Sequence, residues 1–300
     1  MYKQYYLFVK LYLTNQIFDL ILNEMIIKDI LKDTTAMICG RIDPEENNIE
    51  KMLGMMEYNR NVLEACHSVI LVLNKDNRIS EKEMSDIGSA YRENFKRSAI
   101  LQPHPIGMGY QVGHITLDKT GYMFAKNNFN TKYTMKICND ILLSPHFLDV
   151  NVDSSDLYYL PAVSPQRMKN EADIAKRQLS SQTNYIFGPL LYQSWFFIAT
   201  NGTDGLYEHD EELERVFRTW DFKNDIYQER VICAEHSIVK WSIKNNLKRY
   251  SLYSEEQYEN YCKYVMSNQI YDGSLKNIML EPLGITHYHR SKYHILRFNL

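Results

Sequence analysis

Several features that mark common protein classes are missing from this sequence. Its five cysteines form no Cys-x-x-Cys pair, so no zinc spacing is present, and their odd number argues against a disulfide framework and is typical of a reducing compartment. No Gly-x-Gly-x-x-Gly joins a predicted strand to a helix and no Walker sequence occurs, which disfavours dinucleotide-dependent dehydrogenases and P-loop nucleotidases. The formal charge of −3 and the lack of a basic stripe argue against nucleic acid as a partner.

Long apolar runs are also missing. No stretch of about 18 uninterrupted apolar residues occurs, so no transmembrane helix is predicted. The N-terminal segment is apolar, but Lys10 interrupts it and no small-residue cleavage site follows, so no signal peptide is predicted. We therefore expect a cytoplasmic protein, and peripheral contact of its N-terminal helices with the inner face of a membrane stays open.

The first half of the chain alternates between apolar runs and amphipathic segments. Strands are predicted at Thr34–Cys39, Ser68–Leu73 and Ser98–Leu101, and helices are predicted between them at 48–65 and 80–95. Such alternation is typical of a mostly parallel sheet with helices on its faces. The sequence therefore predicts an α/β fold.

The rest of the chain continues this pattern less regularly. Residues 1–32 are predicted to form one or two helices, 102–113 a loop with two prolines and three glycines, and 149–156 a solvated acidic turn. Further strands are predicted at 157–163 and 195–199. No internal repeat or low-complexity linker occurs, which indicates one compact unit.

The segment from Leu117 to Asp140 contains the first candidate site. A helix is predicted at 117–126 and a strand at 132–137, and the strand ends in Cys138-Asn139-Asp140. Ligands bind at the carboxyl ends of strands in open α/β sheets. Asp140 is therefore either a metal ligand, since hard divalent cations take oxygen ligands and keep some from water and phosphate, or an ordinary turn or cap residue.

Two other groups of polar residues are candidates. Glu235 and His236 follow an apolar segment, near the predicted start of a helix. Glu235 is either an acid favoured by the helix dipole or a general base. His287 and His289, two residues apart, share a face if the basic C-terminal tail is a strand there; the tail would then ligate a metal or neutralise phosphate.

Three segments make the chain resemble nucleotide-sugar glycosyltransferases with the GT-A fold, in particular families that build bacterial or viral surface polysaccharide such as lipopolysaccharide. These segments are TTAMICGRID at 34–43, GYMFAKNNFNTKYTMKICND at 121–140 and CAEHSIVKW at 233–241. The resemblance spans about 34–250. It implies a GT-A-like, mostly parallel central sheet at 34–250, after an N-terminal helical segment at 1–33 and before a C-terminal acceptor-side helix and tail at 251–300.

The resemblance also implies a function and a set of site residues. The enzyme would move a sugar from a nucleotide-diphosphate donor to a glycan or lipid-linked acceptor, with Mn²⁺ or Mg²⁺ as cofactor. The implied roles are nucleotide-sugar binding by Arg41, Asp43, Lys126, Asn139 and Asp140, metal binding by Asp140, His287 and His289, and catalysis by Glu235 and His236.

The chain departs from the family at the metal motif, which is Asp-x-Asp. Cys138 stands where the first Asp belongs, and Asp140 keeps the second position. The enzyme would then bind metal weakly, recruit another group such as a tail histidine, or work without metal. The same substitution motivates an alternative, a non-catalytic carbohydrate-binding or assembly protein on a degenerate transferase fold. A nucleotidyltransferase or phosphotransferase is a third alternative.

Overall fold

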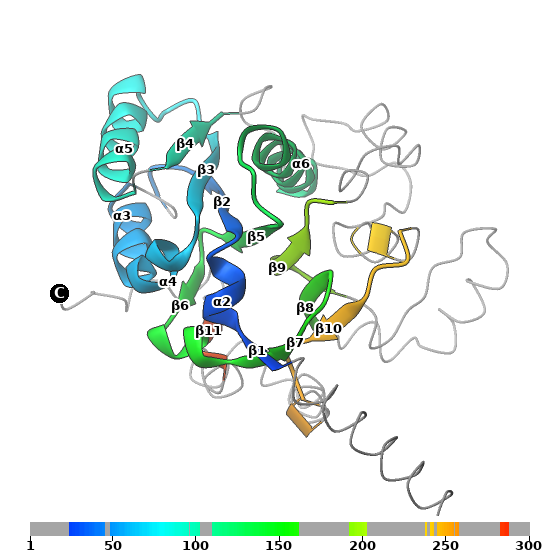
Figure 1. The fold of residues 1–300 in the computed structure, drawn as a ribbon. Coiled ribbons are helices and arrows are strands. Elements are labelled where there is room, and N and C mark those ends of the chain that lie inside the picture. The colour runs from blue at the N-terminus through cyan, green and yellow to red at the C-terminus, as the bar shows by residue number, and fades with distance from the viewer. Residues whose placement is uncertain are drawn as a thin grey trace, which may run out of the picture.

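The structure is a computed structural model, and it describes residues 24–45, 49–95, 97–102, 110–161, 192–202, 238, 241–242, 245–254, 256–257 and 283–287. A seven-stranded sheet lies at its centre (Figure 1). The strand order is β10-β8-β9-β5-β2-β3-β4. The strands are β2 (Thr34–Ile42), β3 (Ser68–Lys75), β4 (Ser98–Leu101), β5 (Tyr133–Cys138), β8 (Leu157–Pro161), β9 (Tyr192–Thr200) and β10 (Arg249–Ser251).

The sheet is mostly parallel, which confirms the α/β prediction. Strands β5, β2, β3 and β4 pair with one another in parallel, in that order, and β10 is parallel to β8. Of the seven strands, β9 runs antiparallel to both β5 and β8. All eight residues of β3 are buried, because the strand is central and covered on both faces.

Helices cover both faces of the sheet (Figure 1). The described helices are α2 (Ile27–Leu31), α3 (Ile49–Tyr58), α4 (Arg60–Ala65), α5 (Glu81–Asn94), α6 (Tyr110–Asn128) and the 3-10 helix η1 (Pro145–Asp149). Alternate residues of β2 point to opposite faces: Ile38 joins the core formed with α3, α4 and α5, and Met37 joins the core under α6. None of the described helices is long and apolar enough to cross a membrane.

The direction in which successive strands are added to the sheet reverses once along this part of the chain. From β2 the chain passes to β3 and β4 on one side, and then crosses by α6 to β5 on the other side of β2. The carboxyl ends of β2 and β5 therefore flank a topological switch point. In open α/β sheets the crevice outside such a point is where ligands bind.

Two small antiparallel sheets complete the fold. β1 (Glu24–Ile26) pairs with β7 (Asn151–Asp153), and β6 (Ile141–Leu143) pairs with β11 (Ile285–His287). The prediction of helix throughout 1–32 is wrong at β1, and residues 1–23 lie outside the described residues. The predicted solvated turn at 149–156 is likewise wrong at β7, because this acidic stretch gains hydrogen-bonding partners from a segment distant in the chain.

Two helix boundaries also differ from the prediction. The predicted helix at 48–65 is divided at Asn59, which is fully buried. The Asn59 side chain donates to the carbonyl of Ile141 over 2.9 Å and accepts from the amide of Leu143 over 2.7 Å, so it satisfies the outer edge of β6. The predicted loop at 102–113 is shorter, because α6 begins at Tyr110.

Candidate functional site

The candidate site lies at the switch point, where β2 and β5 end. Cys39 of β2 lies opposite Cys138 of β5 in parallel register. Beyond this pair β5 ends, while β2 continues beside β3 as far as Ile42, so the residues after the two cysteines lie at the same edge of the sheet. They include Arg41 from β2, and Asn139 and Asp140 from β5. The structure thus brings together most of the nucleotide-sugar residues that the sequence predicted.

Asn139 joins the two strand ends. Its backbone amide donates to the carbonyl of Cys39 over 2.9 Å, and its side-chain amide donates to the carbonyl of Arg41 over 3.0 Å. A Cβ atom at Gly40 would overlap the Asn139 side chain, so this close approach requires glycine. Asn139 therefore fixes the two strand ends relative to each other, and its side-chain amide nitrogen already donates a hydrogen bond within the protein.

Charged side chains link the ends of β2 and β3. The Arg41 guanidinium donates to Asp76 over 3.0 Å, and Arg78 contacts Asp76 over 2.9 Å and Glu45 over 2.6 Å. Hydrogen bonds from Arg78 and Arg41 hold the pKa of Asp76 well below its usual range. Asp76 and Arg78 were not predicted as site residues, although Asp76 follows β3 just as Asp140 follows β5.

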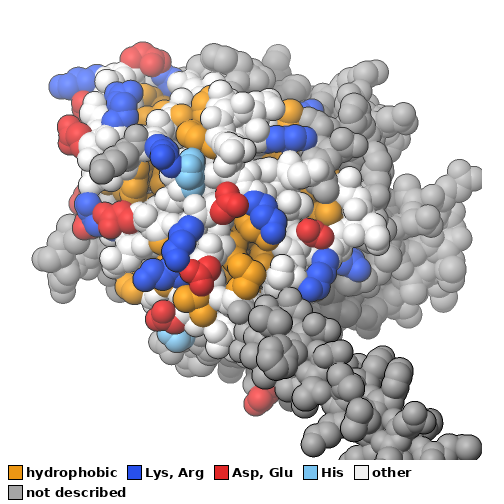
Figure 2. All heavy atoms as spheres, in the orientation of Figure 1, with side chains coloured by type: hydrophobic (Ala, Val, Ile, Leu, Met, Phe, Trp, Pro, Cys, Tyr) orange, Lys and Arg blue, Asp and Glu red, His pale blue; other side chains and the backbone are white. Residues whose placement is uncertain are grey.

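Two carboxylates stand beside this network. Asp43 follows β2 and is largely buried, and its Oδ1 accepts from the Glu45 amide over 3.0 Å. Asp140 is half-buried in the turn between β5 and β6. On the face seen in Figure 2, acidic and basic side chains are intermixed among the described residues. With Asp76 and Glu45 the edge thus contains four carboxylates and two guanidinium groups, and both guanidinium groups already contact a carboxylate of the protein.

The described residues of this edge supply only some of the ligands that a divalent cation needs. Within the described ranges no group of three His, Cys, Asp or Glu side chains could hold a metal ion. Asp140 supplies one carboxylate, which fits a cation that takes its other ligands from water and substrate phosphate. Strand β11 places the backbone of His287 opposite Ile141, the residue after Asp140. The C-terminal segment therefore reaches this turn.

Some predicted site residues are not at this edge. Lys126 lies in the last turn of α6, and the chain leaving α6 meets the opposite, amino edge of the sheet, where Thr131 hydrogen-bonds Thr35 over 2.9 Å. The length of β5 separates Lys126 from Asp140. Glu235, His236 and His289 lie outside the described residues.

A buried ion pair lies behind the site and was missed by the sequence reasoning. Lys136 of β5 donates to Asp118 of α6 over 2.5 Å, and both side chains are fully buried. Burial opposes the charged amine, but the Asp118 carboxylate raises the pKa of Lys136 above its ordinary value. Burial, joined by Asp118, also raises the pKa of the Cys39 thiol. A lysine inside a strand predicted to be central was the available signal.

No protein-family model and no curated protein matches the chain. Solved structures do match. Core-mannan synthase A from Aspergillus fumigatus, in its Mn/GDP form, has 14% identity and a TM-score of 0.36, with 69% of each chain covered.

Two further matches have similar scores. The glycosyltransferase GlyE from Streptococcus pneumoniae has 12% identity and a TM-score of 0.40, and the match covers 90% of this chain and 57% of that one. The inositol-1-phosphate CTP transferase from T. maritima has 9% identity and a TM-score of 0.39, with 80% and 98% covered. The chain thus spans little more than half the length of GlyE. All three TM-scores are below 0.5, so these matches do not indicate a function for this chain.

Proposed function

We propose that this protein is a GT-A-like glycosyltransferase, which moves a sugar from a nucleotide-diphosphate donor to a glycan acceptor during synthesis of surface polysaccharide or another glycan. One observation carries the proposal: Asp140 lies in the turn after β5 at the topological switch point, at the same edge of the sheet as Arg41, near the end of β2, and Asp43, which follows β2. A ligand bound at this edge would contact groups from two parallel strands.

The residues of this edge have distinct roles in the proposed reaction. Asp43 and Arg41 bind the nucleotide, and Asn139 keeps their strand end in place. A divalent cation, held by Asp140 with the tail residues His287 and His289, would supply positive charge for the departing diphosphate. The strand register that sets His287 opposite Ile141 supports the approach of the tail.

The transfer step needs a proton acceptor if it inverts the sugar. The bond between the sugar carbon and the phosphate oxygen breaks, and the diphosphate leaves with the electron pair. The acceptor hydroxyl oxygen bonds to the sugar carbon and loses its proton to Glu235, with His236 beside it. The acceptor is a glycan or a lipid-linked glycan, and we place the enzyme in the cytoplasm; with a lipid-linked acceptor it would work at the inner face of a membrane.

Cys138 favours a second candidate function. Its side chain is buried and provides no oxygen where a first metal carboxylate would stand. A protein with this change would bind carbohydrate or assist glycan assembly without transferring sugar. Such a protein would bind glycans and leave nucleotide-sugar donors intact.

A thermal-shift panel of UDP, GDP, CMP and ADP, with and without manganese, tests the proposal. A ligand of the folded state raises the melting temperature by mass action. We expect one nucleotide diphosphate to stabilise the protein, and Asp140→Ala to remove the part that depends on manganese. Asp153→Ala, at an exposed carboxylate in β7, is the matched control and should respond like the parent.

Two results would contradict the proposal, and a third would change its mechanism. No response to any nucleotide, together with glycan binding, would support the non-catalytic alternative. Release of pyrophosphate from a nucleoside triphosphate would indicate a nucleotidyltransferase. Stabilisation that is equal with and without manganese would retain the transferase and remove the cation from its mechanism.

A further inference from the structure

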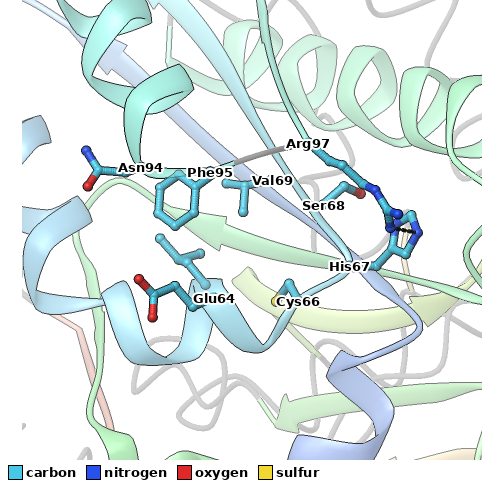
Figure 3. Close-up of a pocket in the computed structure, with 9 residues that line it drawn as sticks. Glu64, Cys66, His67, Ser68, Val69, Asn94, Phe95 and Arg97 are labelled. Atoms are coloured by element: carbon cyan, nitrogen blue, oxygen red, sulfur yellow. Dashed lines mark hydrogen bonds between the residues drawn. The ribbon is translucent and has the colours of Figure 1, made fainter.

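A second pocket opens at the edge of the sheet opposite to Asp140. It has a volume of about 440 Å³ and lies where β3 and β4 begin, between the end of α4 and the end of α5 (Figure 3). Sites for small molecules usually occupy about 300–1,000 Å³. The proposed glycosyltransferase reaction makes no use of this pocket, because β3 and β4 carry it at their amino ends.

His67 presents an unused hydrogen-bond donor at this pocket. Its Nε2 contacts the guanidinium of Arg97, as the dashed line in Figure 3 shows. A guanidinium cannot accept a hydrogen bond, so Nε2 is the acceptor and the proton of the neutral ring is on Nδ1. Nδ1 is buried and has no hydrogen-bond partner in the protein. Burial, together with the charge of Arg97, lowers the pKa of His67, which agrees with a neutral ring.

The backbone that carries the imidazole is fixed by hydrogen bonds. The backbone amide of His67 donates to the carbonyls of Leu31 over 3.2 Å and Thr34 over 2.9 Å. The next residue, Ser68, begins β3, and its hydroxyl shares a hydrogen bond with Thr35 over 2.7 Å. The side chain of His67 therefore starts from a fixed point at the edge of the central sheet, and the contact of Nε2 with Arg97 orients its ring.

Arg97 adds positive charge beside this donor. It is exposed, and the contact with His67 uses one of its two terminal nitrogens. A guanidinium has five N–H groups, so most of them remain available to a ligand. An imidazole N–H and a guanidinium side by side match the oxygens of a carboxylate or phosphate.

The other lining residues are three hydrophobic side chains, one acid, and Cys66, Ser68 and Asn94. The hydrophobic side chains, Leu63, Val69 and Phe95, form the base of the pocket, and Phe95 has the largest exposed fraction of the three, 5%. Glu64 also lines it, but 52% of its side chain is exposed, and Arg60 lies 3.9 Å away. Solvent and Arg60 therefore weaken the repulsion that Glu64 would exert on an anion.

We propose that this pocket binds a small organic anion, with its carboxylate on His67 Nδ1 and the Arg97 guanidinium and its apolar body against Leu63, Val69 and Phe95. The apolar surface distinguishes such a ligand from a free inorganic anion. The site is independent of the nucleotide-sugar site, so either proposal can fail without the other.

Calorimetric titration with benzoate, benzamide and inorganic phosphate tests separately what the charged group and the apolar ring of the ligand contribute to binding. We expect benzoate to bind, benzamide to bind at least tenfold more weakly because it lacks the charge, and phosphate to bind more weakly than benzoate because it lacks the ring. Arg97→Gln should weaken benzoate binding at least tenfold. Arg92→Gln, an exposed arginine of α5 outside the pocket lining, is the matched control and should bind like the parent.

Several results would overturn the proposal. Benzamide that binds as tightly as benzoate, phosphate that binds as tightly as benzoate, or an unchanged benzoate affinity in Arg97→Gln would each do so. The absence of heat with any of the three probes would also do so, because it would mean that water alone fills the pocket.

A measurement on the unmodified protein covers the case in which Arg97→Gln fails to fold. The imidazole resonance of His67, identified by its loss in His67→Gln, should move on addition of benzoate and titrate at higher pH in its presence, because a bound anion favours the protonated ring. A resonance that stays unmoved at saturating benzoate would also overturn the proposal.

Discussion

The Lys136 ammonium and the Asp118 carboxylate meet over 2.5 Å in the core between β5 and α6, and neither side chain is exposed. Lys136 lies two residues before Cys138, so the pair joins the covering helix to the strand that carries Asp140. Each charge is tolerated inside the protein because the other compensates it.

Lys136→Met should therefore destabilise the protein by about 3–5 kcal/mol, because it leaves the Asp118 charge buried without its counter-ion. Urea unfolding measures the free energy. Lys32→Met is the control, because it breaks an exposed pair: the Lys32 and Asp29 side chains are 65% and 48% exposed. It should lower the free energy of unfolding by less than about 1 kcal/mol. Equal losses in the two variants would contradict the assigned role of burial, and a Lys136→Met, Asp118→Leu double variant should recover much of the loss.

Gly40→Ala should disturb the candidate site through Asn139. The new methyl group would overlap the Asn139 side chain and force it from the carbonyl of Arg41. We expect a stability loss of about 1–3 kcal/mol and weaker nucleotide binding. Gly202→Ala is the control, because its Cβ would lie 3.6 Å from the nearest atom, Thr200 Oγ1. Unchanged nucleotide binding in Gly40→Ala would separate Asn139 from the site.

Glu235→Gln tests the proposed base. The amide cannot accept the acceptor proton, so turnover should fall by about 10²–10⁴-fold, while the thermal shift with the nucleotide stays as in the parent. Steady-state rates with a nucleotide-sugar donor give the first quantity. Glu256→Gln, at an exposed residue, is the control. A turnover equal to that of the parent would remove Glu235 as the base.

Ser80→Ala should weaken the start of α5. The Ser80 hydroxyl accepts from the Glu83 amide over 3.2 Å, and the Glu83 carboxylate accepts from the Ser80 amide over 2.7 Å, which forms a capping box. Loss of such a cap costs about 0.5–2 kcal/mol. Ser85→Ala, at an exposed position inside the same helix, should not destabilise it. Thermal unfolding of the two variants provides the comparison.

His67 should make stability depend on pH. Its pKa is lower in the folded than in the unfolded protein, because burial and Arg97 disfavour the charged ring. The unfolded chain then binds more protons, so stability is full above the unfolded pKa of about 6.5 and falls as the pH drops below it. Unfolding at pH 7.5 and 5.5 should show a smaller decrease in His67→Gln than in the parent. His146→Gln, at an exposed histidine, should keep the parent's decrease.

The helices and strands of the central sheet were largely predictable from local patterns. The continuous apolar run of β3 requires burial on both faces, and the polar segment after Ser80 has the signature of a capped helix. The break at Asn59 could not be predicted in this way. It exists because the Asn59 side chain satisfies Ile141 and Leu143, which are far away in the sequence.

The candidate site was predictable in part for the same reason. Asp140 was placed correctly at the end of a strand, because the strand pattern stops just before it. The family resemblance grouped Lys126 with it, but α6 and β5 run in opposite directions, so the helix ends at the far edge. Asp76 and Arg78 enter the edge through the pairing of β2 with β3.

By itself, therefore, the sequence determined the alternation of strands and helices, since hydrophobic periodicity acts over neighbouring residues. It also determined that a carboxylate follows β5. Only the tertiary structure decided which strand ends share an edge, that Lys136 meets Asp118, and that His67 and Arg97 line a common pocket. These are contacts between distant segments, and their partners are selected by strand order, register and burial of the whole chain.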